Sequence, residues 1–332
     1  MADSPESSAS DREGLVLRSV FHGAQPASHP ALVLLAGASG AGAGRAIALV
    51  RRMHGGNLVP VSSEDLQAFH PRYLEPSFRA STAGQNELSR AAASWLQASL
   101  AHARENRYSL LLEGAFRSPS TALAVARRFA DSNYQVHVVV AATRSEESPL
   151  SATSRGLREV QQRLQSQFVT PAENEGSFAY VDALVSASAA DSAVDRVSVI
   201  GRRGLTVLDA HRTDPTAMAN VSSAFRASCS EKMSALEAAQ WLSELRHMTA
   251  YAQSLRSIPP AALESLIELH EMAIRKVVPD LPVPPDSQVV PIQLVALRSS
   301  LAALKQRADR HDSPDIAAPV VTPSTPGTSI SR

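Results

Sequence analysis

A glycine-rich turn between an apolar segment and a helical segment constrains the fold more than any other feature of this sequence. Residues 31–36 are continuously apolar, as in a buried strand, and residues 46–53 begin a helical pattern. Glycines between them allow successive backbone N–H groups to curl around an anion at a helix N-terminus, where the helix dipole favours negative charge. The sequence therefore predicts a phosphate-binding loop of nine consecutive residues, Gly37, Ala38, Ser39, Gly40, Ala41, Gly42, Ala43, Gly44 and Arg45.

This loop has the shape of a phosphate-binding loop but lacks its charge. Gly37 and Gly42 fit the pattern G-x-x-x-x-G-K-[ST], whereas Ala43 stands in place of the lysine and Gly44 in place of the magnesium-binding hydroxyl. No lysine precedes Lys232, so no other lysine of this half replaces the missing one. Such an electrostatic clamp contributes ~3–4 kcal/mol in a transition state. Phosphate binding is the favoured interpretation, and a tight structural or dinucleotide-binding turn is the alternative.

Apolar and helical segments alternate beyond this loop. The alternation is typical of an α/β protein with a doubly wound, mainly parallel sheet. Ligands bind at the C-terminal ends of such strands, so the loop, residues 62–65 and Glu113 are expected to line one crevice. Residues 168–194 show only a weak pattern. Strands are predicted at 31–36, 58–61, 108–112 and 135–142, a hairpin at 195–200 and 205–208, and helices at 46–53, 82–105, 118–131 and 149–167.

The pattern changes after about residue 210, where helices follow one another without strands. Both ends of the chain are polar and rich in serine, and we expect them to be disordered. The helices are predicted at 230–256, 261–278 and 290–311. The predicted organisation is a disordered tail (1–15), an α/β domain (16–210), a smaller all-helical region (211–311) and a second disordered tail (312–332).

Composition excludes several functional classes. The 332 residues include 32 basic and 32 acidic side chains, so no net charge attracts nucleic acid or an anionic membrane surface. Cys229 is the only cysteine, which rules out a disulfide framework and a cysteine-based zinc site. No signal peptide or membrane-spanning segment is apparent. We expect a soluble cytoplasmic protein without metal-ligand clusters and without nucleic-acid or membrane partners.

Two glutamates at predicted strand ends are candidates for chemistry. Glu113 directly follows an apolar strand, where a carboxylate usually meets a cation, a metal or a ligand hydroxyl. The alternative for Glu113 is an ion pair with Arg117. Glu64 is either a general base for a substrate hydroxyl or part of a helix cap formed by residues 62–65. Arg117, Arg155 and Arg158 are candidates for phosphate contacts, and a solvated surface position is the alternative for each.

Taken together, these stretches resemble the zeta toxin family, small P-loop kinases of bacterial toxin–antitoxin systems. The resemblance covers about residues 30–209, and it implies that the sheet is of P-loop kinase type and that residues 16–210 form a kinase domain. It implies a kinase that uses ATP or GTP with Mg²⁺ and transfers the γ-phosphate to the 3′-hydroxyl of UDP-N-acetylglucosamine or to a related small acceptor. The segments that carry it are the glycine loop, Phe69-His-Pro-Arg-Tyr73, Leu111-Leu-Glu-Gly-Ala-Phe-Arg117, Ser148-Pro-Leu150 with Arg155, and Arg196-Val-Ser-Val-Ile-Gly-Arg-Arg-Gly204.

The resemblance also implies residue roles. Glu113 matches the substrate-binding glutamate and Arg117 the arginine that follows it. Arg155 matches an arginine for the γ-phosphate, and Glu64 stands in place of the catalytic aspartate. Nucleotides and nucleotide sugars are the implied ligands, and an antitoxin protein is an implied partner. The helical region 211–311 either packs on the kinase domain or binds such a partner.

Several positions depart from the family pattern, and these departures leave two hypotheses for the function. One hypothesis is a kinase weakened by loss of the loop lysine. The other is a pseudokinase that binds a nucleotide, a nucleotide sugar or a protein and transfers nothing. The departures are Ala43, Gly44, Ser62, Gln67, Ala115 and Phe168, the last near the place of a second phosphate arginine.

Overall fold

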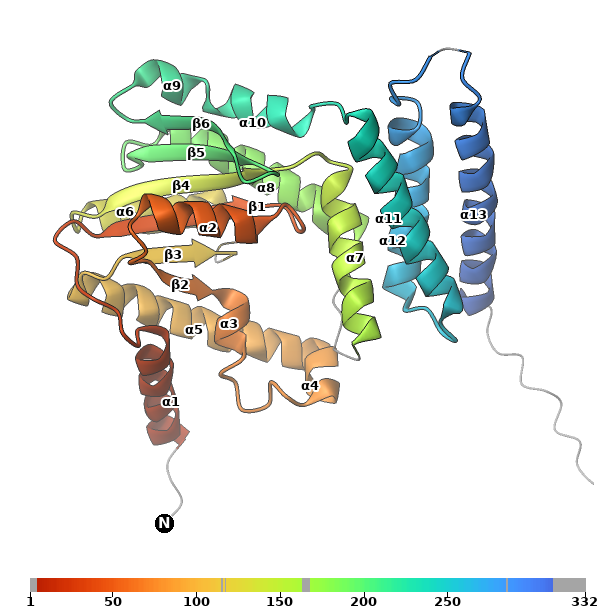
Figure 1. Ribbon diagram of the computed structural model, residues 1–332. Helices are drawn as coiled ribbons and strands as arrows, with labels where there is room; N and C mark the ends of the chain where they lie inside the picture. The colour runs from red at the N-terminus through yellow and green to blue at the C-terminus, as the bar shows by residue number, and fades with distance from the viewer. Residues whose placement is uncertain (1–4, 115, 117, 163–167, 285, 313–332) are drawn as a thin grey trace, which may run out of the picture.

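The computed structural model describes residues 5–114, 116, 118–162, 168–284 and 286–312 (Figure 1). Its centre is a six-stranded sheet with the strand order β2-β3-β1-β4-β5-β6. Neighbouring strands are parallel, except that β6 runs antiparallel to β5. The predicted doubly wound, mainly parallel sheet is confirmed. The strands are β1 Ala31–Gly37, β2 Val59–Ser62, β3 Leu110–Glu113, β4 Gln135–Ala142, β5 Arg196–Gly201 and β6 Thr206–His211.

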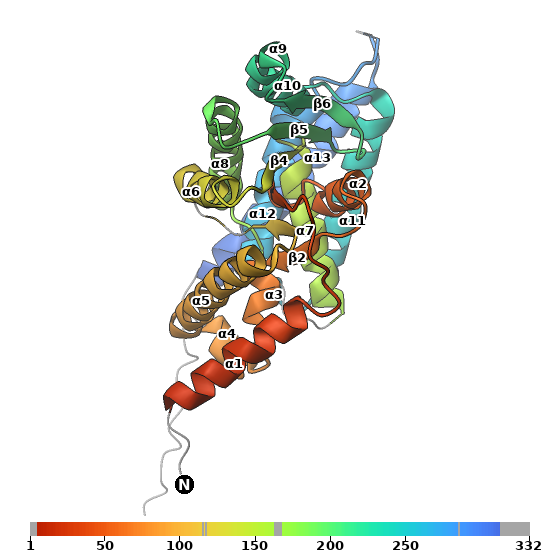
Figure 2. The same cartoon turned by 90° about the vertical axis from the view of Figure 1, so that its left-hand side faces the viewer.

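Helices cover both faces of the sheet, and β1 contributes side chains to each core in turn. Leu32 and Leu34 lie in the core on one face, and Val33 and Leu35 lie in the core on the other. Figure 2 shows α2 on one side of the sheet and α6 and α8 on the opposite side. Burial on both faces explains the continuous apolar strands. The helices of this part are α1 Pro5–Val20, α2 Ala43–Met53, α3 Ser63–Gln67, α4 Pro76–Ala80, α5 Thr82–Asn106, α6 Pro119–Ala130, α7 Glu147–Gln161, α8 Pro171–Ala190, α9 Pro215–Ala219 and α10 Val221–Cys229.

Helix α8 occupies most of the segment in which the sequence shows only a weak pattern. Its buried residues Val181, Leu184, Val185 and Ser188 follow helical spacing and pack toward the core. Alanine and serine make up much of the remaining surface of the helix. The contrast between its apolar and polar faces is therefore too small to identify the helix from the sequence.

The prediction of a disordered tail at residues 1–15 is wrong for most of that segment, because α1 begins at Pro5. Val16 is fully buried, Phe21 is buried, and Leu17 and Val20 pack against the same core. These residues hold the C-terminal half of α1 in place, and a helix extends from an existing turn at little cost, even into polar sequence. Residues 1–4 and 313–332 of the two predicted tails lie outside the described residues.

The chain after β6 forms two groups of helices, and the predicted boundary at residue 211 falls before the first group. Helices α9 and α10 place Met218, Val221 and Phe225 in the core of the sheet domain. The later helices share a second core with Leu150 and Leu157 of α7, and α11 and α12 lie beside α7 (Figure 1). The boundary therefore falls between α10 and α11. The later helices are α11 Ala235–Ser254, α12 Pro260–Met272 with a π-helical extension Ala273–Val277, and α13 Val289–Asp312.

None of the described helices combines the length and the hydropathy that a membrane-spanning helix needs.

Candidate active site

The glycine loop joins the end of β1 to the start of α2. Gly40 (φ 82°) and Gly42 (φ 86°) have left-handed backbone conformations, which glycine adopts without strain. A Cβ on Gly40 would lie 2.6 Å from the carbonyl oxygen of Ser148, so a side chain there would displace the loop. No side chain caps α2, which leaves its first N–H groups available to an anion. The loop therefore has the backbone of a phosphate cradle.

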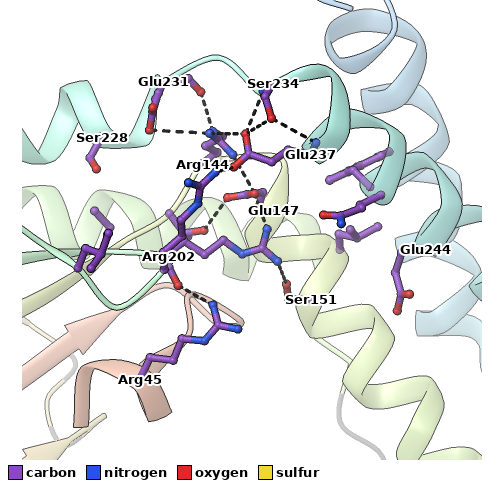
Figure 3. A pocket seen from close by; sticks show the side chains of 18 of the residues that line it. Arg45, Arg144, Glu147, Ser151, Arg202, Ser228, Glu231, Ser234, Glu237 and Glu244 are labelled. Atoms are coloured by element: carbon purple, nitrogen blue, oxygen red, sulfur yellow. Dashed lines mark hydrogen bonds and ion pairs between the residues drawn. The ribbon is translucent and has the colours of Figure 1, made fainter. Parts of the chain in front are cut away.

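The first residues of α2 do not supply the positive charge that this loop lacks. Ala43 packs against the apolar core beneath α2, and a Cβ on Gly44 would meet only open space. Arg45 extends to the β5–β6 turn, where its guanidinium donates a hydrogen bond to the carbonyl oxygen of Arg202 at 3.0 Å (Figure 3). Arg45 therefore does not take the place of the lysine.

Helix α7 brings a cation and a hydroxyl to the loop. The Arg155 guanidinium donates to Ser39 Oγ at 3.3 Å, and the Ser148 hydroxyl donates to the Ser39 carbonyl oxygen at 2.5 Å. Arg155 is exposed and forms no ion pair with a described residue. The structure thus places this sequence-predicted arginine beside the loop that lacks a lysine. Arg117 and Ala115 lie outside the described residues.

Glu113 ends β3 close to the other candidate charges. The strand register pairs it with β1 on one side and with Ser62 of β2 on the other. Burial raises the pKa of Glu113, and the carboxylates of Asp65 and Glu64 raise it further, whereas the Arg155 guanidinium lowers it. Charges at or just after the ends of two neighbouring strands, β2 and β3, therefore act on one another and on Arg155 of α7, as expected for one crevice.

The hydrogen bonds of the turn after β2 show which of its acidic residues takes part in the helix cap. Ser62 Oγ accepts a hydrogen bond from the Asp65 backbone N–H at 3.0 Å and donates one to the Asp65 carboxylate at 2.7 Å. Asp65 therefore belongs to the N-cap of α3. Glu64 is exposed and forms no hydrogen bond or ion pair with a described residue. The helix cap uses Asp65 and leaves the Glu64 carboxylate available.

Two cavities flank α7. The first, of about 950 Å³, is lined by the glycine loop, Glu113, Arg155 and side chains of α6 and α8. The second, of about 730 Å³, lies between the β5–β6 turn, α7 and α11 (Figure 3). Ser151 and Arg158 line both cavities. Glu64 does not line the first cavity, although its charge influences Glu113.

A cluster of ion pairs lines the second cavity, and none of its members was predicted as a site residue. Arg144 is 10% exposed and pairs with Glu147 at 3.0 Å and with Glu237 at 3.3 Å. Glu147 also pairs with Arg202, and Glu237 pairs with Arg203 at 2.7 Å. A hydrogen bond from the backbone at the α11 cap and then the Arg203 guanidinium lower the pKa of Glu237 to about 2. The available signals were an arginine soon after an apolar strand and a capping-box pattern before α11.

Phe168 lies near the position where the resemblance places a second phosphate arginine, and it packs against α7. A Cβ on Gly156 would lie 2.8 Å from the Phe168 ring, which belongs to the second core. This position therefore serves packing. Within the described ranges, no group of three or more His, Cys, Asp or Glu side chains is arranged to hold a metal ion.

Sequence comparison relates the chain to known toxins. The zeta toxin family model matches residues 18–214, which is more than half of the chain. Toxin PezT of Streptococcus pneumoniae serotype 4 (strain ATCC BAA-334 / TIGR4) is 27% identical over 139 residues, which make up 42% of this chain and 55% of PezT. The chain thus spans about half the length of this curated relative.

Structural comparison agrees on the fold. A structure from the PezAT chromosomal toxin–antitoxin system of Streptococcus pneumoniae matches with a TM-score of 0.63 and 18% identity, covering 76% of this chain and 98% of that chain. The AvrRxo1-ORF1:AvrRxo1-ORF2 structure with ATP has a TM-score of 0.43 and 14% identity, covering 92% of this chain and 88% of that chain, and this similarity is too low to support a conclusion. On the evidence of the family match, the chain belongs to the zeta toxin family.

Proposed function

We propose that this chain is a phosphotransferase that moves the γ-phosphate of ATP or GTP to a hydroxyl group of a small acceptor. The acceptor we infer is UDP-N-acetylglucosamine, at its 3′-hydroxyl, or a related nucleotide sugar. The observation that carries the proposal is the meeting of the glycine loop, Arg155 and Glu113 in one cavity. We expect weak activity, because Ala43 offers no charge to the transferring phosphate.

The donor phosphates fit the loop. The uncapped N–H groups of α2 and the glycine backbone form a cradle that a Cβ on Gly40 would obstruct. Arg155 supplies positive charge beside Ser39. The second cavity adjoins the first at Ser151 and Arg158, and we assign the donor nucleoside to it. Phosphate oxygens and water would provide most ligands of a magnesium ion, since the loop lacks its usual hydroxyl.

The acceptor is assigned to the space between the two glutamates. Glu113 accepts a hydrogen bond from an acceptor hydroxyl, and Glu64 removes the proton from the hydroxyl that attacks the γ-phosphate. Two observations support this division of roles. Glu113 lines the cavity itself, and the Glu64 carboxylate is close enough to raise the pKa of Glu113 without being used in the α3 cap.

The departures at the loop favour a second candidate function. A chain with Ala43 and Gly44 in place of the lysine and the hydroxyl can retain phosphate binding and lose transfer, which describes a pseudokinase. The relative PezT is a toxin, and the solved relative comes from a toxin–antitoxin system. For either function we therefore infer an antitoxin protein as partner and the cytoplasm as the place of action.

A transfer assay separates the two functions. Wild type, Ala43→Lys and Glu113→Ala are incubated with Mg²⁺, γ-labelled ATP or GTP and a panel of acceptors led by UDP-N-acetylglucosamine. We expect slow transfer by wild type, transfer roughly 100- to 1,000-fold faster after Ala43→Lys, and none after Glu113→Ala. Silence of both wild type and Ala43→Lys would establish the pseudokinase instead. Transfer unchanged by Glu113→Ala would show that the acceptor site is wrongly assigned.

A further inference from the structure

A third cavity lies between the N-terminal part of α7, the start of α8 and the helix α12. Its volume of about 310 Å³ is at the lower end of the range of small-molecule pockets, which is about 300–1,000 Å³. None of the residues that line it also lines either of the other two cavities. The third cavity is therefore separate from the places assigned to the donor and the acceptor.

The Thr153 hydroxyl lines this cavity and has no hydrogen-bond partner among the described residues. Thr153 is only 3% exposed. A helical threonine often donates to the carbonyl oxygen four residues earlier, as Thr249 of α11 does at 2.7 Å, and Thr153 makes no such bond. A buried hydroxyl without a partner costs free energy, and a ligand in the cavity can supply that partner. The other lining hydroxyls all donate within the protein, Ser145 to Glu146, Thr170 to Glu173 and Ser265 to the carbonyl oxygen of Ala261.

The charged side chains of the cavity wall are carboxylates. Glu175 of α8 forms no hydrogen bond or ion pair with a described residue, and Glu268 of α12 has one ion pair, at 4.0 Å with Arg275. Of the described residues that line the cavity, none is a lysine, an arginine or a histidine. Lys276, in the π-helical extension of α12, is already paired with Glu146 at 3.3 Å. The cavity therefore favours a positively charged ligand.

We propose that the third cavity binds a small organic ammonium ion with an apolar body and one hydrogen-bonding group on that body. The ammonium group binds to the carboxylates of Glu175 and Glu268, and the group on the body pairs with the Thr153 hydroxyl. The inference does not depend on the proposed function, because it concerns none of the residues assigned to transfer. The apolar body packs against wall side chains of the same kind, those of Pro149, Val169, Phe178 and Met272.

Three related compounds test this site on the full chain. Tyramine has an ammonium group, an aromatic body and a hydroxyl group, whereas 4-ethylphenol lacks the amine and phenethylamine lacks the hydroxyl. Ligand-observed NMR titration measures the three affinities. We expect tyramine to bind roughly threefold or more tightly than either of the other compounds, because it alone engages both the carboxylates and Thr153.

Two variants assign these preferences to residues. Thr153→Val should weaken tyramine binding about two- to tenfold and change phenethylamine binding by less than about twofold, since phenethylamine has no group for this hydroxyl. Glu268→Gln should weaken the binding of both amines about two- to fivefold and leave 4-ethylphenol binding unchanged.

Thr249→Val is the matched control for Thr153→Val. Thr249 is also buried in a helix, and it lines none of the three cavities. Its replacement removes a hydrogen bond and should lower Tm without changing tyramine binding. Thr153→Val removes no hydrogen bond to a described residue, so we expect it not to lower Tm.

The remaining outcomes overturn the proposal in distinguishable ways. No binding of either amine, equal affinity for tyramine and 4-ethylphenol, or unchanged amine binding after Glu268→Gln would exclude a site for cations. Equal losses of the two amines after Thr153→Val, or an equal loss of tyramine binding after Thr249→Val, would mean that Thr153 forms no hydrogen bond with the ligand. A Tm lowered as much by Thr153→Val as by Thr249→Val would mean that the Thr153 hydroxyl already has a partner within the protein.

Discussion

The two cavities beside α7 differ in how their arginine side chains are paired with carboxylates. In the first, Arg155 stands beside the glycine loop without a carboxylate partner among the described residues. In the second, Arg144, Arg202 and Arg203 are each held by a glutamate. Arginines already paired with carboxylates offer little attraction to a phosphate. Among the described residues, the cation that contacts the loop without a carboxylate partner is Arg155 of α7.

Because the arginines of the two cavities are paired differently, we expect their removal to have different consequences. Arg144 is buried and, besides its ion pairs, donates to the backbone carbonyl oxygens of Glu231 and Lys232, which lie between α10 and α11. It therefore joins the sheet domain to the start of the second group of helices. Arg155 has no such structural bonds, so its loss is expected to change ligand binding and not folding.

Replacement of Arg144 should have the largest effect on stability. Arg144→Met leaves the buried Glu147 carboxylate with one remaining ion-pair partner and two backbone carbonyl groups without a donor. Loss of one partner of a buried ion pair costs about 3–5 kcal/mol, and we expect a decrease of that size in the free energy of unfolding measured with urea.

Arg203→Met is the control within the same cluster. Arg203 is 73% exposed and pairs with Glu237, so its loss should lower the free energy of unfolding far less than Arg144→Met does. Similar losses in the two variants would mean that burial does not distinguish these two arginines.

The contrast between the two cavities also shows what the sequence can predict. The glycine loop between β1 and α2 was predictable because its requirements are local, namely an apolar strand, glycines at left-handed positions such as Gly40 and Gly42, and a following helix. The meeting of Glu113 with the Ser62 turn followed from the rule that parallel strands end at one edge of the sheet. These features depend on short segments and on topology alone.

The ion-pair cluster was not predictable in the same way. Arg144 and Glu237 lie far apart in the sequence, and their contact depends on how α11 packs beside α7. The local sequence pattern around a buried arginine such as Arg144 is the same as that around an arginine on the surface, so the pattern does not predict burial. The contact of Arg155 with Ser39 also depends on packing, and the sequence named Arg155 only as one of three candidate arginines.

Replacement of Arg155 should have an intermediate effect, on binding and not on folding. We expect Arg155→Met to weaken ATP binding roughly 10- to 150-fold, since hydrogen bonds to charged groups contribute about 1.5–3 kcal/mol, and to leave the urea midpoint unchanged. The loss should be smaller when Ala43→Lys is also present, because the lysine then shares the charge of the phosphates. Calorimetric titration measures both, with the exposed Arg51→Met on α2 as control. Equal losses with and without the lysine would mean that the two positions do not serve one phosphate group.

The smallest effect is expected from Glu113, and its sign is opposite to that of Glu237 in the second cavity. The pKa of Glu113 is raised above its ordinary value of 4.5, so its ionisation opposes folding. That penalty is absent below the unfolded pKa and complete above the folded one. Glu113→Gln should therefore slightly raise Tm at pH 7 and leave it unchanged at pH 4.

Glu237 should respond in the opposite direction. Its pKa is lowered to about 2, so its ionised form favours folding above the unfolded pKa, and this contribution is lost as pH falls toward the folded value. Glu237→Gln should lower Tm at pH 7, and the difference from wild type should shrink as the pH is lowered. Thermal melts of both variants across this pH range measure the contrast directly. A fall in Tm at pH 7 for both variants would mean that Glu113 has a stabilising partner, and the first cavity would then lack the unpaired carboxylate assigned to the acceptor.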